Sequence, residues 1–410
     1  MNVEFKAALR LASSPDLRLK IRNIGNGGKM QLQPELETKR SVAIIGTRGY
    51  PSYYGGFETA VRKLAPSLAE SGWDVTVYGR PGPEAADPAR DARVHVVTTR
   101  GIENKSLSTL SFGLTSCLHA ARSKPDVALI MNVANGFWLP LLKLRGIPTV
   151  VNVDGIEWER AKWGRLAKTV FRLGARLTAR YADELVADSK EISRRWEADF
   201  GRSSVFIPYG GEEGVARTAP DEFPKRKFVL AVARFVPENT IPEFLEAARG
   251  IAKDYDVVIV GSSGYGGPLE DAVTRLVEEN SKVHWLGHVS DDARLLALWN
   301  TCGVYFHGHS VGGTNPALVQ AMANGAPIVA RSTVYNREVL GAAGAFCEPT
   351  PESIEAAVRE VMESADEQDR LSAAARLRLQ DGYTWEAVCS SYEMTISEQA
   401  ELGRRVAVAK

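Results

Sequence analysis

The residues that could do chemistry lie in four loops, and each loop follows an apolar segment that predicts a buried strand. The first loop is GTRGYPSYYGGFET, residues 46–59, in which Gly55 and Gly56 stand just before an amphipathic helix. Glycines let the backbone approach a ligand, and the free amides of a helix start attract phosphate or carboxylate. A purely structural turn is the alternative. The loop lacks G-x-G-x-x-G, and Gly79–Arg80 replaces the acidic residue expected after the next strand, which disfavours a nicotinamide cofactor.

The most informative loop is HGHSVGGTNPALVQAMANGAPIV, residues 307–329. Asn315 can cap a helix that begins at Pro316, and the loop formed by Gly312, Gly313 and Thr314 leaves backbone amides open to a diphosphate. Gln320 would face the same cleft, where its amide suits the hydroxyls of a sugar or ribose.

A third loop, VARFVPENTIPEF at 232–244, contains Arg234, a permanent bidentate donor for phosphate, and Thr240, which predicts a capping-box helix start. The alternative for Arg234 is a surface ion pair. In the fourth loop, VNVDGIEWERAKWG at 151–164, Asp154 ends a strand and Glu157 follows closely. Ligands bind at this end of open parallel sheets, so Asp154 could orient a sugar hydroxyl; capping the next helix is its alternative role.

Metal ligands are sparse around these loops. His307 and His309 are two residues apart, but no cysteine or carboxylate cluster completes a site beside them, so we predict no metal and no other cofactor. The four cysteines are widely spaced, which fits neither a zinc site nor a disulfide framework and suits a reducing cytosol.

Two series of strands alternating with helices position these loops. They predict an α/β protein with two Rossmann-like parallel-sheet domains, residues 41–212 and 226–383, joined by a linker at 213–225. Residues 384–410 predict a helix that could pack back on the first domain. Residues 1–40, with eight basic and four acidic side chains, are interpreted as a flexible tail, either solvated or touching anionic lipid.

The length, the net charge and the apolar pattern of the chain exclude several classes of protein. With 410 residues the chain is long enough for two domains, and its formal charge of zero favours neither nucleic acid nor an anionic membrane as the main partner. No apolar run is long enough for a membrane span, and the amino terminus does not resemble a signal peptide, so we predict a cytoplasmic protein.

Taken in order, the four loops and FIPYGG at 206–211 make residues 41–399 resemble the retaining glycosyltransferases of family four. Within that family the chain is most similar to bacterial rhamnosyltransferases of capsule and exopolysaccharide assembly. The resemblance implies a GT-B fold, a nucleotide-diphosphate sugar on the second domain, a saccharide acceptor on the first, and retention at the donor carbon. A polyprenyl-linked acceptor would bring the protein to the inner face of the cell membrane as a peripheral contact.

Carried over residue by residue, the resemblance assigns catalysis to Arg234 and Asp154 and acceptor binding to Asp154 and Glu157. The donor-binding residues it implies are Gly55, Gly56, Arg234, Asn239, His309, Gly312, Gly313, Thr314, Asn315 and Gln320. Three positions depart from the common family pattern. Asn239 replaces a lysine, and Gly312 and Gln320 replace two glutamates; the subgroup shares the first two changes, whereas Gln320 would weaken hydrogen bonds to sugar hydroxyls by about 1 kcal/mol each. A non-catalytic nucleotide-sugar scaffold and a GT-B sugar epimerase are the alternative functions.

Overall fold

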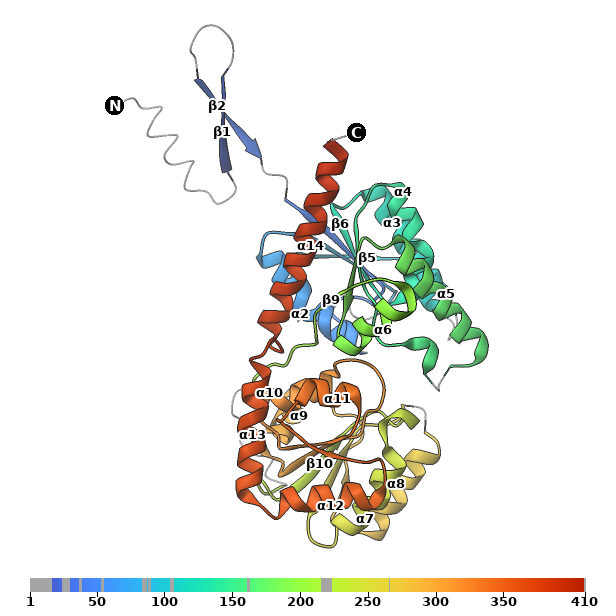
Figure 1. Cartoon of the computed structure of the whole chain (residues 1–410), viewed down its shortest axis with the longest axis vertical. Helices are drawn as coiled ribbons and strands as arrows, with labels where there is room; N and C mark the ends of the chain where they lie inside the picture. Colours follow the sequence, from blue (N-terminus) through green and yellow to red (C-terminus); the bar gives the residue numbers. More distant parts are fainter. Residues whose placement is uncertain are drawn as a thin grey trace, which may run out of the picture.

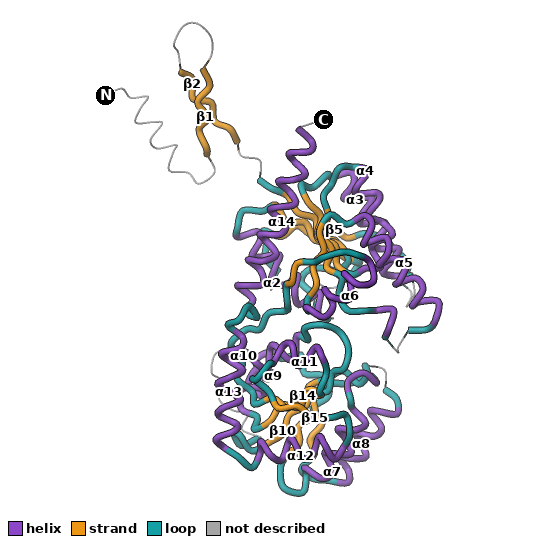
Figure 2. The backbone as a smooth tube through the Cα atoms, in the orientation of Figure 1, coloured by secondary structure: helices purple, strands orange, loops and turns teal. Residues whose placement is uncertain are grey.

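The computed structural model describes residues 17–23, 30–36, 39–52, 55–82, 87, 90–103, 107–160, 163–214, 223–264 and 266–408. Two domains lie one above the other in Figure 1, and each has a twisted parallel sheet at its centre with helices on both faces, as Figure 2 shows by colour. This architecture is the predicted pair of Rossmann-like domains.

The sheet of the first domain has seven parallel strands in the order β5-β4-β3-β6-β7-β8-β9. Its strands are β3 (Ser41–Ile45), β4 (Asp74–Gly79), β5 (Val94–Thr98), β6 (Val127–Met131), β7 (Thr149–Asn152), β8 (Glu184–Ala187) and β9 (Val205–Phe206). Alternate residues of β3 face opposite cores: Val42 and Ile44 pack on one side, and Ala43 and Ile45 on the other. Both faces are therefore buried, which explains the nearly continuous apolar strand sequences.

The helical segments of this domain are α2 (Gly56–Glu70), α3 (Ser108–Ser123), η2 (Val133–Trp138), α4 (Leu139–Leu144), η3 (Glu157–Glu159), α5 (Arg165–Tyr181) and α6 (Lys190–Phe200). Helix α2 follows the predicted pattern, burying the apolar stripe that contains Val61, Leu64 and Leu68. It covers one face of the sheet, and α3, α4, α5 and α6 cover the other.

The second domain repeats the plan with six parallel strands in the order β12-β11-β10-β13-β14-β15. Its strands are β10 (Phe228–Val232), β11 (Asp256–Val260), β12 (Val283–Trp285), β13 (Val304–His307), β14 (Ile328–Arg331) and β15 (Ala345–Cys347). Its helical segments are η4 (Pro237–Asn239), α7 (Ile241–Ile251), α8 (Pro268–Glu279), α9 (Asp292–Thr301), α10 (Pro316–Ala323), α11 (Val334–Leu340), α12 (Pro351–Met362) and α13 (Ala365–Leu379). The sequence pattern did not predict β15, a strand of only three residues.

The last helix, α14 (Trp385–Val408), returns to the first domain, where Figure 1 shows it beside α2. Val388, Tyr392 and Ile396 join the core that α2 also covers, and the hydroxyl of Tyr392 accepts a hydrogen bond from Nδ2 of Asn152 at 2.6 Å. The chain thus crosses between the domains twice, so both domains are anchored to each other by covalent connections.

Two antiparallel strands, β1 (Leu17–Asn23) and β2 (Met30–Leu36), form a hairpin in the segment that we expected to lack regular structure. Leu17, Leu19 and Ile21 alternate with polar residues, which is the period of a strand and a signal that the basic composition obscured. The predicted contact of residues 1–40 with anionic lipid depends mainly on side chains that the structure does not describe. Across the described helices, none combines the length and the apolar character that crossing a membrane requires.

Candidate functional site

The loop before α10 has the geometry of an anion site at a helix start. Gly312 has a φ of 92°, which favours glycine. Asn315 is the N-cap of α10, because its Oδ1 accepts the amide hydrogen of Ala317 at 3.0 Å, and Pro316 is the first helical residue. Negative charge is favoured at such a helix start, because its first backbone amides have no partner within the helix.

The first domain approaches this loop so closely that several glycines are required. A Cβ on Gly56 would lie 2.9 Å from the hydroxyl of Tyr209 and 3.6 Å from Cγ of Pro316. A Cβ on Gly155 would lie 3.3 Å from Cα of Gly312. The two predicted glycine-rich loops therefore face each other across the boundary between the domains, which we call the cleft.

Asp154 follows β7 at this cleft and has a φ of 57°, a conformation that non-glycine residues seldom adopt. Its amide donates to Oδ1 of Asn152 at 2.9 Å, which holds the turn. Such outliers concentrate where the fold aims a side chain at a ligand. The position suits the role predicted for Asp154 without testing it.

Glu157 lies beyond Asp154 with only 4% of its surface exposed. Its Oε1 lies 2.7 Å from Nε of Arg160, and its Oε2 accepts the indole hydrogen of Trp163 at 2.8 Å. Both oxygens thus position neighbouring side chains. Binding of the saccharide acceptor by Glu157 stays a prediction. Arg160 points toward the second domain, because a Cβ on Gly312 would lie 3.5 Å from its Nη2.

Arg234 is exposed at the end of β10, and no described acidic residue pairs with it. Asn239 does not face outward beside it; its Nδ2 donates to the carbonyl of Arg234 at 2.8 Å and closes the turn. The predicted capping box at Thr240 is wrong. Thr240 has a φ of 56° and makes no side-chain cap, since its Oγ1 donates to the carbonyl of Gly308 at 2.6 Å.

His309 lies near two guanidinium groups at the cleft. Burial, and then the charges of Arg234 and Arg160, lower its pKa to about 3, so its imidazole is neutral at physiological pH. Its ring stacks on that of His307 with the centroids 4.4 Å apart. A neutral imidazole has one donor and one acceptor nitrogen, so it can bind a sugar hydroxyl without adding a third positive charge beside the two guanidinium groups.

Two buried carboxyl groups were absent from the predicted site. Neither carboxylate oxygen of Glu238 has a hydrogen-bond partner among the described residues, and Arg160 lies within electrostatic range. A Cβ on Gly313 would lie 2.0 Å from Oδ1 of Asp188, and burial followed by the charge of Asp154 raises the pKa of Asp188 well above its usual value. Asp188 immediately precedes Ser189, which caps α6.

Two predicted donor-binding residues, Thr314 and Gln320, form hydrogen bonds with other segments of the chain. The hydroxyl of Thr314 donates to the carbonyl of Asp188 and so joins the domains. Gln320 contacts the segment that follows β9 and leads to the second domain: its Nε2 donates to the carbonyl of Glu212 at 2.7 Å, and its Oε1 accepts from the amide of Glu212 at 3.3 Å. In this structure Gln320 therefore binds the segment that connects the domains. A glutamate at this position could accept the hydrogen bond from the amide of Glu212, but it could not donate one to the carbonyl.

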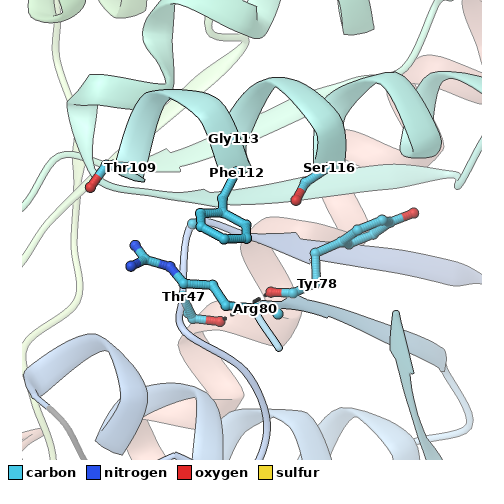
Figure 3. A pocket seen from close by; sticks show the side chains of 9 residues that line it. Thr47, Tyr78, Arg80, Thr109, Phe112, Gly113 and Ser116 are labelled. Atoms are coloured by element: carbon cyan, nitrogen blue, oxygen red, sulfur yellow. Dashed lines mark hydrogen bonds between the residues drawn. The ribbon is translucent and has the colours of Figure 1, made fainter. Parts of the chain in front are cut away.

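A narrow pocket opens at the carboxyl ends of β3 and β4, below α3 (Figure 3). The guanidinium of Arg80 lies 5.0 Å from the centroid of the Phe112 ring, and Thr47 and Ser116 add hydroxyl groups to the lining. The pocket occupies the edge of the sheet where open α/β folds bind ligands.

Among the described residues, no group of three or more His, Cys, Asp or Glu side chains could hold a metal ion.

Two family models together match most of the chain. The model described as Glycosyl transferase 4-like domain matches residues 55–210, and the one described as Glycosyl transferases group 1 matches residues 215–378. A comparison with curated protein sequences gave no match.

Solved structures share the whole fold at low sequence identity. Sucrose-phosphate synthase from Thermosynechococcus elongatus superposes with a TM-score of 0.72 at 17% identity, covering 91% of this chain and 100% of its own. HepE from Anabaena in complex with UDP gives 0.68 at 18%, covering 88% and 100%. WaaG, a glycosyltransferase involved in lipopolysaccharide biosynthesis, gives 0.65 at 12%, covering 86% and 99%. The two family matches, which together cover most of the chain, show that it belongs to the glycosyltransferases, and the superpositions and the paired parallel sheets show that its fold is GT-B.

Proposed function

We propose that this glycosyltransferase moves a sugar from a nucleotide-diphosphate donor to a saccharide acceptor with retention of configuration at the donor carbon. The observation that carries the proposal is the capped start of α10. The loop before it, Gly312 to Thr314, lies within contact distance of Gly155 and Arg160 of the other domain. Helix-start amides and guanidinium groups converge where a diphosphate would leave.

In the proposed mechanism, Arg234 and the amides before α10 stabilise the negative charge that develops on the departing diphosphate. The acceptor hydroxyl attacks the face that the diphosphate leaves and passes its proton to a donor phosphate oxygen. Asp154 and the neutral ring of His309 orient sugar hydroxyls near the reacting carbon. No side chain in this mechanism requires a metal.

The donor is best sought by thermal shift, because a ligand that binds only the folded protein raises the melting temperature. Structures of HepE hold UDP, UDP with glucose, and UDP-glucose, so uridine nucleotides belong in the first panel. Nucleotide-activated L-rhamnose belongs there too, because the four loops resemble those of bacterial rhamnosyltransferases. We propose surface-polysaccharide assembly on a polyprenyl-linked acceptor as the setting.

Arg234→Ala tests the mechanism once a donor is known. Loss of a fixed cation at the leaving group is expected to lower turnover about a hundredfold. Arg275→Ala is the matched control, since Arg275 is also exposed and lies on α8 of the same domain. Turnover within a few-fold of the parent for Arg234→Ala would exclude the assigned role.

Product analysis separates this function from its rivals. Slow transfer of the sugar to water is expected of a transferase and not of a nucleotide-sugar scaffold. Epimerisation of the free sugar without any acceptor would identify an epimerase. Nuclear magnetic resonance of the first-formed product gives its anomeric configuration, and inversion would refute the proposed retention.

A further inference from the structure

Helix α5 carries an unusual distribution of charge for a protein with no net charge. Its 17 residues, RLAKTVFRLGARLTARY, include five cations and no acidic residue. Those cations are Arg165, Lys168, Arg172, Arg176 and Arg180. None of the five forms an ion pair with any acidic residue that the structure describes. The next acidic residue along the chain, Asp183, is held by the amide and hydroxyl of Thr149.

The four arginines form one exposed stripe. Arg165, Arg172, Arg176 and Arg180 are spaced by seven, four and four residues, so they lie on one side of the helix, and all four are exposed. At 1.5 Å per residue the stripe is about 22 Å long. The opposite side is fixed to the domain, because Gly174 and Ala175 are buried and a Cβ on Gly174 would lie 2.7 Å from the carbonyl of Val133.

Large apolar side chains lie in solvent beside the arginines. Leu166 is 81% exposed and Leu173 is 44% exposed, and their spacing of seven residues puts both on the border of the arginine stripe. Leu144, at the end of α4, is 83% exposed, and α4 packs against α5. Figure 1 shows α4 and α5 on the outer side of the first domain, opposite α2 and α14.

We propose that α5, together with Leu144 of the adjoining helix α4, docks the first domain on an anionic lipid bilayer. The arginines would bind lipid phosphates while the leucines enter the boundary between head groups and acyl chains. Charge alone would equally suit a nucleic acid, but exposed leucines next to the cations are an advantage only at a surface with an apolar layer beneath its phosphates. The inference does not depend on the identity of the donor or acceptor.

The test is sedimentation of the full chain with phosphatidylcholine vesicles that contain or lack phosphatidylglycerol. Binding is expected only with the anionic lipid, and it should weaken as salt is raised. Each cation near such a surface contributes about fivefold to partitioning, so neutralising Arg172 and Arg176 together to Gln should weaken binding on the order of 25-fold. Leu166→Ser with Leu173→Ser should weaken the binding that remains at high salt.

A matched control removes the same amount of positive charge from the other domain. Lys253→Gln with Arg275→Gln removes two exposed cations from the second domain and should leave vesicle binding unchanged. All variants should keep the parent melting temperature and donor turnover in solution, because these side chains lie outside the cleft. Equal binding to neutral vesicles, unchanged binding by the α5 variants, or binding to a duplex oligonucleotide but not to vesicles would each overturn the proposal.

Discussion

Glu338 joins the two domains by a contact whose loss should open the cleft. It lies on α11 of the second domain, and its carboxylate accepts three hydrogen bonds from the start of α6 in the first. The donors are the amide of Lys190 at 2.7 Å, the hydroxyl of Ser189 at 2.8 Å and the amide of Glu191 at 3.2 Å. A carboxylate at a helix start also interacts favourably with the helix dipole.

Glu338→Gln removes the charge and replaces one of the two accepting oxygens with an amide that faces hydrogen-bond donors. Loss of the dipole interaction costs about 0.5–1 kcal/mol, and weakening of the charge-assisted hydrogen bonds costs about 1–1.5 kcal/mol more. Because these contacts exist only when the domains touch, the total of about 2 kcal/mol shifts the closure equilibrium roughly 30-fold toward the open form. The loss of kcat/KM should approach this factor if turnover requires closure.

The assay is energy transfer between dyes placed on one exposed site in each domain. Labelling can be specific, because all four native cysteines are buried. Asp291→Asn is the matched control: its carboxylate caps α9 within the second domain, accepting from the amides of Ala293 at 2.9 Å and Arg294 at 3.3 Å. Unchanged energy transfer in Glu338→Gln, or an equal change in Asp291→Asn, would refute the reasoning.

Three further changes test other parts of the site. Gly313→Ala is expected to lower kcat/KM at least tenfold while melting stays within a few degrees, because the added Cβ would lie 2.0 Å from Asp188 of the other domain only when the cleft is closed. Asn315→Ala should cost about 1 kcal/mol through loss of the helix cap, which calorimetry would detect as a melting temperature lower by roughly 2–4 °C; no shift would contradict the cap. Because the pKa of His309 is lowered to about 3, the unfolded chain binds a proton that the folded chain does not. The free energy of unfolding should therefore fall by about 1.4 kcal/mol per unit as the pH falls from about 6.5 toward 3. The raised pKa of Asp188 acts in the opposite direction, so the measurement is the slope of urea-unfolding stability against pH in the parent minus that in His309→Asn, and equal slopes would contradict the assignment.

The sequence by itself determined the architecture. Apolar runs such as those of β3 and β10 are short and nearly continuous, and helix-length segments separate them; parallel strands covered on both faces are what such a pattern builds. The start of α10 was equally readable, because Asn315 followed by Pro316 is a local signal that needs no distant partner. The glycine loops could be recognised for the same reason, since close approach restricts the residue type at the position itself.

Tertiary structure alone decided how individual polar side chains are used. Gln320 binds the backbone of Glu212, 108 residues earlier in the sequence, and Asn239 turns inward to the carbonyl of Arg234. Glu238 and Asp188 became candidates only because folding buries their carboxyl groups at the cleft. Burial and contacts between distant segments set the orientation, the pKa and the partner of a side chain. A local sequence pattern records backbone preference and periodicity, so it predicts where loops form and leaves open what each polar side chain in them contacts.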